Sequence, residues 1–116
     1  MKISKQNSEH YIWGQNCDSW VLLNSEQLSI KQEVIPPNSK EEFHFHKCAQ
    51  QFFFILKGVA TFIVDEETFE VEESSGFHIT PNKIHLVENK SDVNLEFLVI
   101  SNPSTNNDRF ATEKLK

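Results

Sequence analysis

The stretch HFHKCAQQFFFILKG, residues 44–58, carries the pattern that organises this chain. His44 and His46 are two residues apart, so in a β-strand both imidazoles project from the same face. A few residues later, the range 51–57 predicts another strand, which Gly58 ends. A third histidine from a distant segment, His85, would complete three ligands of a metal site, because imidazole suits zinc, iron, copper and nickel.

Short apolar segments alternate with turn residues along most of the chain, and helix signals are scarce. The segment PPNS at 36–39 is typical of a turn, because proline restricts φ and asparagine tolerates a left-handed backbone. Many short strands at close spacing favour an all-β, nearly closed antiparallel structure such as a jelly roll. The predicted strands are 19–23, 27–35, 41–47, 51–57, 59–64, 69–72, 77–80, 85–88 and 94–100.

The length of 116 residues predicts a single domain. Within it we expect a barrel at about 27–100, preceded by an N-terminal strand segment at 10–26. The tail at 102–116 is expected to form a short helix or a frayed end.

The charge and the apolar content of the chain argue against some classes of binding partner and location. The net charge is −6, from 17 acidic and 11 basic residues, and no cluster of Lys or Arg suggests a nucleic-acid partner. No apolar run reaches membrane-spanning length, and the N-terminus lacks the apolar region of a secretory signal. A cytoplasmic protein is therefore expected. Cys17 and Cys48 are expected to be free thiols, although a single disulfide is the alternative.

The strand at 51–57 is apolar on both faces, which is typical of a strand covered on both sides. With Gln51 pointing inward, Phe53 and Ile55 would do the same. The opposite face would carry Phe52, Phe54 and Leu56. We expect a second subunit to cover this outer face, giving a homodimer, and the alternative is a neighbouring sheet of the same chain.

Two motifs resemble those of the cupins. In the first, the family has Gly, five residues, HxH, three or four residues, Glu, six residues and Gly. Here the chain has His44, His46, then Gln51 in place of Glu, then Gly58, with Asn38 at the upstream Gly. In the second motif, the matching residues are His85 and Asn89, while Ser74, Thr80 and Asn82 stand where the family has Gly, Pro and Gly.

The resemblance covers about residues 27–100 and implies a double-stranded β-helix, the jelly-roll cupin barrel, with a metal inside near one mouth. It implies His44, His46 and His85 as ligands. The fourth family position falls on Gln51. Gln50 fits the shorter allowed spacing but leaves seven residues before Gly58, so Gln51 is favoured.

Glutamine at this position changes the expected chemistry. Unlike Glu, Gln51 offers a neutral carbonyl oxygen and cannot take a proton in the working range. Four neutral ligands leave a divalent ion with its full charge and favour zinc, iron, nickel or copper over manganese. The alternative is that Gln51 is an inward polar residue bonded to His46 or to the backbone.

Other residues have simpler expected roles. His78 should point outward, and Asn89 should fix a turn through its side chain. The candidates to line a ligand cavity are Phe53, Ile55 and Phe97.

Two functions remain open from the sequence. One is a metal-dependent enzyme acting on a small metabolite, either dioxygenase-like or a Lewis-acid isomerase or lyase. The other is a non-catalytic module that binds or senses a small molecule without a required metal. A general base is missing from the motif. The remaining candidates for it, none of them clearly placed, are Glu41, Glu42 and Glu88.

Overall fold

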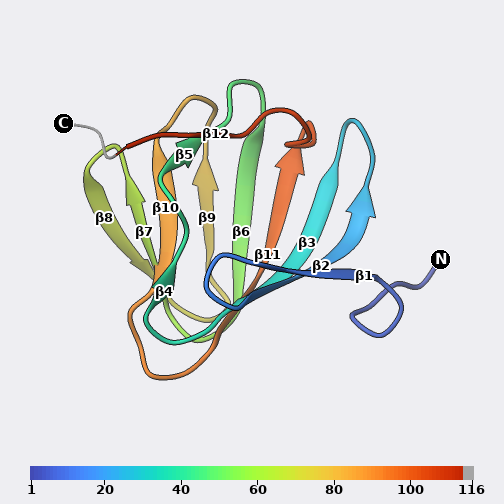
Figure 1. The fold of residues 1–116 in the computed structure, drawn as a ribbon, viewed down its shortest axis with the longest axis horizontal. Helices are drawn as coiled ribbons and strands as arrows, with labels where there is room; N and C mark the ends of the chain where they lie inside the picture. The colour runs from blue at the N-terminus through green and yellow to red at the C-terminus, as the bar shows by residue number, and fades with distance from the viewer. Residues whose placement is uncertain (114–116) are drawn as a thin grey trace.

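The protein is built from two antiparallel sheets that face each other (Figure 1). This computed structural model describes residues 1–113. Its strands are β1 (Glu9–Trp13), β2 (Cys17–Asn24), β3 (Ser29–Ile35), β4 (Ser39–Lys40), β5 (His44–Phe45), β6 (Gln50–Lys57), β7 (Ala60–Val64), β8 (Glu67–Val71), β9 (Gly76–Ile79), β10 (His85–Asn89), β11 (Leu95–Asn102) and β12 (Phe110–Ala111).

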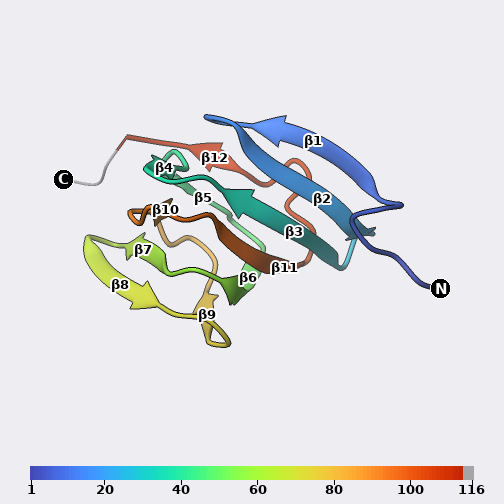
Figure 2. The same cartoon turned by 90° about the horizontal axis from the view of Figure 1, so that it is seen from below.

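The strand order shows that the chain crosses repeatedly between the two sheets. One sheet has the order β1-β2-β3-β11-β6-β9, and the other has the order β12-β5-β10-β7-β8, with β4 also paired to β10. The two layers are visible in Figure 2. The predicted all-β jelly roll is therefore confirmed. Residues 1–113 contain no helix that could span a membrane.

The alternation in β6 explains its run of phenylalanines. Phe53 and Ile55 are buried between the sheets, whereas Phe52 and Leu56 lie on the outer face and are exposed. Inside, the ring of Phe53 packs at centroid distances of 5.0 Å from Phe62 and 5.6 Å from Phe97. These three rings belong to the hydrophobic core between the sheets.

Both chain ends add strands beyond the predicted barrel. The N-terminal segment forms a hairpin in which β1 pairs with β2 at the sheet edge. The expected helical or frayed tail is wrong for the described part, because the chain crosses the mouth of the barrel and β12 pairs with β5. This crossing is the red segment in Figure 1. Residues 114–116 of that expected tail lie outside the described residues.

Three turns have a left-handed backbone at the positions where the family motifs have glycine and this chain has another residue. The φ angles are 60° at Asn38, 64° at Ser74 and 69° at Asn82. Asparagine is among the few non-glycine residues that tolerate this region. The lost glycines therefore leave the turn geometry in place.

Candidate metal centre and its cavity

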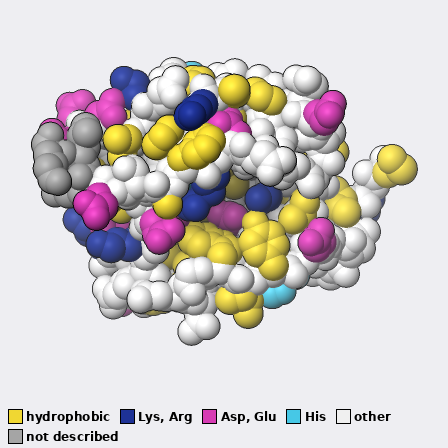
Figure 3. Space-filling view, turned by 45° about the horizontal axis from the view of Figure 1, so that its top comes forward, with side chains coloured by type: hydrophobic (Ala, Val, Ile, Leu, Met, Phe, Trp, Pro, Cys, Tyr) yellow, Lys and Arg dark blue, Asp and Glu magenta, His cyan; other side chains and the backbone are white. Residues whose placement is uncertain are grey.

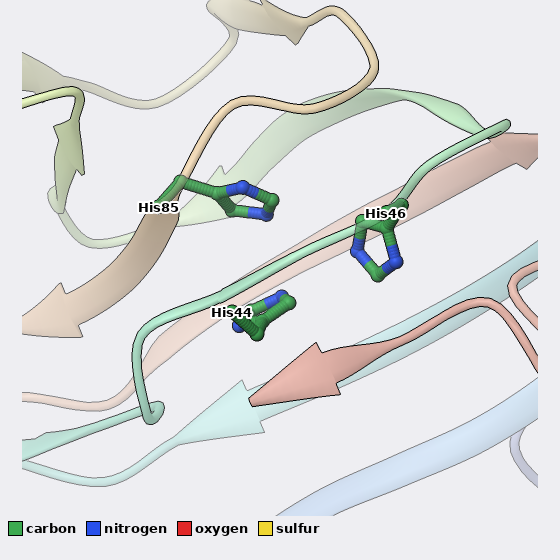
Figure 4. Close-up of side chains that lie close together, drawn as sticks. All are labelled: His44, His46 and His85. Carbon is green, nitrogen blue, oxygen red and sulfur yellow. The ribbon is translucent and has the colours of Figure 1, made fainter. Parts of the chain in front are cut away.

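Three histidines meet inside the barrel near its mouth (Figure 4). His44 of β5 is paired directly with His85 of β10, and His46 follows β5 by one residue. One ring nitrogen from each residue lies within 4.8 Å of the others. All three side chains are buried, at 2%, 4% and 1% exposure for His44, His46 and His85. The strand pairing, rather than the local sequence, therefore assembles the cluster.

Each imidazole is oriented by a hydrogen bond from its Nδ1 to a main-chain carbonyl. His44 Nδ1 donates to Glu42 O at 2.8 Å, His46 Nδ1 to Asp108 O at 2.6 Å and His85 Nδ1 to Lys83 O at 2.7 Å. A carbonyl can only accept, so these contacts place the proton on Nδ1 and the lone pair on Nε2. Such hydrogen bonds are typical of histidines that bind metals.

The fourth side chain of the centre is Gln51, which is buried. Its Nε2 donates a hydrogen bond to Ser101 Oγ at 3.0 Å, which turns the amide oxygen away from Ser101. Among the described residues, that oxygen has no hydrogen-bond partner, and neither do the Nε2 atoms of His46 and His85. Buried acceptors without partners are costly. Three imidazole nitrogens and an amide oxygen form a donor set that fits a transition metal.

Burial keeps the imidazoles in the form that binds metals. Desolvation lowers the pKa of His44 to about 2, with the neighbouring His85 and Arg109 adding to the effect. Desolvation also lowers the pKa of His85 to about 4 and lowers that of His46. All three rings are therefore neutral near pH 7, with their Nε2 lone pairs available.

Asp108 supports the centre from a segment that the motifs do not include. Besides the bond from His46 to its carbonyl, its carboxylate accepts hydrogen bonds from the backbone N–H groups of Lys47, Cys48 and Ala49 at 2.7, 3.0 and 3.0 Å. Burial opposes ionisation, but these three donors hold the pKa of Asp108 below its usual value. We call this set of bonds the Asp108 clamp. Sequence reasoning missed it, because only the path of the tail brings Asp108 to the loop.

His44 and His46 open into a cavity of about 680 Å³. Figure 3 shows a hollow on this face, with basic and acidic side chains inside it and hydrophobic side chains around it. Its volume lies within the range of about 300–1,000 Å³ typical of small-molecule sites. The lining residues are Tyr11, Trp13, Gly14, Gln15, Lys31, Glu33, Lys40, Glu41, Glu42, His44, His46, Gln51, Phe53, Val99, Ser101, Thr105 and Arg109.

Two carboxyl groups in the cavity wall have perturbed acidity. Desolvation raises the pKa of Glu41 to about 8, and the charge of Glu33 adds to this. The Glu41 carboxyl accepts a hydrogen bond from the N–H of Val87 at 3.1 Å. Desolvation also raises the pKa of Glu33, while the hydroxyl of Ser19 opposes the shift. Both groups are candidates for acid–base roles.

Of the acids weighed from the sequence, Glu41 and Glu42 line the cavity, and Glu88 does not. Glu33 was missed. Its signal was present in the alternation of β3, where Glu33 and Ile35 are buried and Val34 is half-buried on the other face. An acidic residue in register with a buried apolar one indicates an inward carboxyl.

The structure separates the residues expected to line the cavity. Phe53 lies in its wall, whereas Ile55 and Phe97 are packed in the hydrophobic core.

His78 points outward, as expected, and its Nε2 lies 2.8 Å from Oε1 of the exposed Gln50. Gln51 is thus the member of the glutamine pair that faces the histidines. Asn89 fixes its turn as expected, donating to the carbonyls of Ile35 and Val93. Both cysteines are free.

Sequence comparison finds one family and two relatives of note. The family model described as Cupin domain matches residues 31–101. An uncharacterized protein of Methanocaldococcus jannaschii, MJ1618, is 32% identical over 75 residues, which is 65% of this chain and 60% of that protein. The uncharacterized HTH-type transcriptional regulator YdeC of Bacillus subtilis is 35% identical over 75 residues, which is 65% of this chain but 24% of the regulator. The match thus spans less than two thirds of either relative.

Structural comparison finds similar folds with low identity. The polyketide cyclase RemF from Streptomyces resistomycificus superimposes with a TM-score of 0.84 at 13% identity, covering 100% of this chain and 87% of RemF. A predicted oxalate decarboxylase from Thermotoga maritima gives a TM-score of 0.79 at 17% identity, covering 90% of this chain and 100% of that one. At these identities the likeness establishes the fold.

Proposed function

This chain belongs to the cupin family, and on that premise we propose that it is a metal-dependent cupin that binds and transforms a small metabolite in the barrel cavity. His44, His46 and His85 would hold a divalent transition metal, with Gln51 as a fourth ligand. The observation that carries this proposal is the set of buried acceptors without partners, formed by the Nε2 atoms of His46 and His85 and the Gln51 oxygen.

The chemistry of the ligands favours particular metals. Because all four donors are neutral, the ion would keep its full charge, and zinc, iron, nickel or copper suits imidazole better than manganese does. Such an ion, when bound, supplies Lewis acidity or, if iron or copper, oxygen activation. The side chains of Glu33 and Glu41 in the same cavity could donate or accept a proton, which compensates for the absence of the family glutamate.

Elemental analysis tests the proposal. Protein purified without an affinity tag or chelator should contain close to one equivalent of one transition metal per chain, and His46→Ala should lose it. His78→Ala is the matched control, because His78 is exposed on β9 and should not alter metal content. Full metal content in His46→Ala would remove His46 from the ligand set. No metal in the wild type, even after metal is added, would overturn the proposal.

The alternative is a binding or sensing module that works without metal. It is favoured by the hydrogen bond from Gln51 to Ser101, which a purely structural glutamine would also make. The similarity to a segment of a transcriptional regulator is consistent with such a role. A metal-free protein that binds a small molecule in this cavity would support this second function.

We also propose that the protein is a homodimer through the outer face of the sheet containing β6. On this face Ile100 of β11 lies between Ile30 and Phe52, and Leu98 lies beside Phe54. A second copy of the chain would cover this apolar row with its own equivalent row. Light scattering during size-exclusion chromatography should give twice the chain mass, and Phe52→Glu should shift it to the monomer.

A cytoplasmic location is proposed from the two free thiols, which are typical of a reducing compartment. Fractionation of cells should find the protein with cytoplasmic markers.

A further inference from the structure

Resting on the proposed function, we infer that the cavity binds a small organic anion and that Arg109 holds its acidic group beside the three histidines. The ligand class is a hydroxylated compound of metabolite size carrying a carboxylate or a phosphate. Arg109 is anchored by its neighbours in sequence, has no acidic partner among residues 1–113 and shares the cavity lining with two lysines.

The backbone of Arg109 is fixed on both sides. The preceding residue is Asp108, whose clamp holds the loop after His46. The following residue is Phe110 of β12, which pairs with Phe45 and stacks on its ring at a centroid distance of 5.4 Å. A side chain held at its base in this way loses less freedom when it binds a ligand.

The guanidinium group of Arg109 has no acidic partner among residues 1–113. The ion pairs of this part of the chain involve other residues, and the polar contact of Arg109 is Nη2 to His44 Nδ1 at 3.3 Å. That nitrogen also lies 2.8 Å from Glu42 O, and the shorter contact takes its proton, so His44 Nδ1 offers no lone pair to Arg109. Five N–H donors in a cavity wall are thus left for a ligand, and their planar fork matches carboxylate and phosphate.

The other charged groups of the cavity favour an anion. Lys31 and Lys40 line it together with Arg109, and Glu42 is an acidic residue of the same lining. Burial raises the pKa of Glu33 and raises that of Glu41 to about 8, so Glu41 is largely protonated near pH 7 and cancels little positive charge. The protonated form of Glu41 donates a hydrogen bond, which suits a hydroxyl or carbonyl oxygen on the ligand.

Lys31 is a second cation in the wall of the cavity. Its Nζ donates to the Tyr11 hydroxyl at 3.0 Å and lies 5.5 Å from the Tyr11 ring centroid. This contact ties β3 to β1 and holds the ammonium group at the cavity wall, on a different strand from Arg109. The two cations can therefore attract an anion from separate walls of the cavity.

The fluorescence of Trp13, which lines the cavity, provides a binding signal. We would titrate metal-loaded protein with malate, with glycerol 3-phosphate and with neutral glycerol as the matched uncharged probe. At least one anion should change the fluorescence saturably, and glycerol should not. Saturation by malate alone would identify the carboxylate as the acidic group, and saturation by glycerol 3-phosphate alone would identify the phosphate.

Variants of Arg109 test whether its side chain binds the anion. Arg109→Gln should weaken binding of the anion by about tenfold or more, and Arg109→Lys should weaken it less, because it keeps the charge but loses the fork. Lys90→Gln removes the same charge from an exposed loop and should leave binding unchanged. Metal content, measured in each sample, should stay at the wild-type value.

Equal binding by Arg109→Gln and wild type would overturn the inference, as would binding of glycerol as tight as that of the anions, or no binding of either anion. Each of these results with full metal content would leave the proposed metal centre standing. Loss of metal from the wild-type protein itself would instead overturn the proposed function.

Discussion

Asp108 and His46 are joined across sixty-two positions of sequence by a hydrogen bond of 2.6 Å from the imidazole Nδ1 to the Asp108 carbonyl. The carboxylate of the same residue binds the N–H groups of the three residues after His46. One residue of the tail thus both orients a candidate metal ligand and fixes the loop that carries it. Changes in the Asp108 clamp should therefore alter stability and metal binding together.

Asp108→Asn should weaken the clamp, because an amide presents only one accepting oxygen to three N–H groups. We expect the free energy of unfolding to fall by about 1–3 kcal/mol, measured by urea denaturation, and the affinity for metal to fall by about tenfold or more, measured by calorimetry. Asp92→Asn, in an exposed turn, is the control and should change neither. Wild-type affinity in Asp108→Asn would show that the clamp does not position His46.

The buried histidines should make the metal-free protein sensitive to acid. The pKa of His44 and that of His85 are lowered from 6.5 to about 2 and about 4, so the unfolded chain takes up protons at a higher pH than the folded one. The contribution of these two histidines to stability is therefore complete above the unfolded pKa and is lost as pH decreases below 6.5. Between about pH 7 and about pH 5 the two histidines should lower the free energy of unfolding by roughly 2–4 kcal/mol. Glu41, with its pKa raised to about 8, acts in the opposite direction over the same range. The histidine contribution is therefore measured as a difference between the wild type and a histidine variant.

A single substitution tests whether the buried histidines cause this dependence of stability on pH. His85→Asn removes one of the two histidines, so relative to the wild type it should lose less stability as the pH falls from about 7 to about 5. His78→Asn alters an exposed histidine whose polar contact is the neutral Gln50, and it should keep the wild-type slope. Identical slopes in all three proteins would mean that the buried histidines are not the source.

Asn89 is fully buried and uses both ends of its amide. The nitrogen donates to Ile35 O and Val93 O, and the oxygen accepts from the N–H and hydroxyl of Ser91. Asn89→Ala would remove these hydrogen bonds, although the Ser91 hydroxyl would still donate to Val93 O. The variant should be less stable by about 2–4 kcal/mol in urea denaturation. Asn94→Ala, on an exposed residue, should stay within about 0.5 kcal/mol of wild type. Similar losses in both variants would contradict the assigned role.

Ser74 occupies a left-handed conformation, with φ at 64°, although serine has a Cβ that crowds the backbone there. Ser74→Gly should relieve this crowding and raise the free energy of unfolding by about 0.5–1 kcal/mol. Ser74→Ala keeps the Cβ and should bring no gain, which separates the backbone effect from loss of the hydroxyl. Chemical denaturation of the three proteins measures both differences, and an equal gain in the alanine variant would refute the explanation.

Much of the site was predictable from local sequence. The spacing of His44 and His46 requires both rings on one face of an extended segment, and the alternation in β6 separates Gln51 from Gln50 in the same way. The side-chain role of Asn89 followed from its position at a turn. These predictions hold because strand periodicity and turn chemistry depend on neighbouring residues alone.

The cavity was less accessible to sequence reasoning. Arg109 and Asp108 lie in a tail without strong periodicity, and the pairing of β12 with β5 brings them to the histidines. Glu33 is one acid among several on alternating strands. The burial that raises its pKa depends on the other strands that enclose it.

The sequence by itself determined the all-β class, the strands of the barrel and the three histidines that can share a metal, because alternation and spacing are properties of the chain alone. Only the tertiary structure decided that the tail crosses the mouth, that Arg109 lines the cavity with no acidic partner in the described part of the chain, and that two carboxyls stand there with raised pKa. These features depend on desolvation and on contacts between segments far apart in sequence, and both exist only once the sheets have packed.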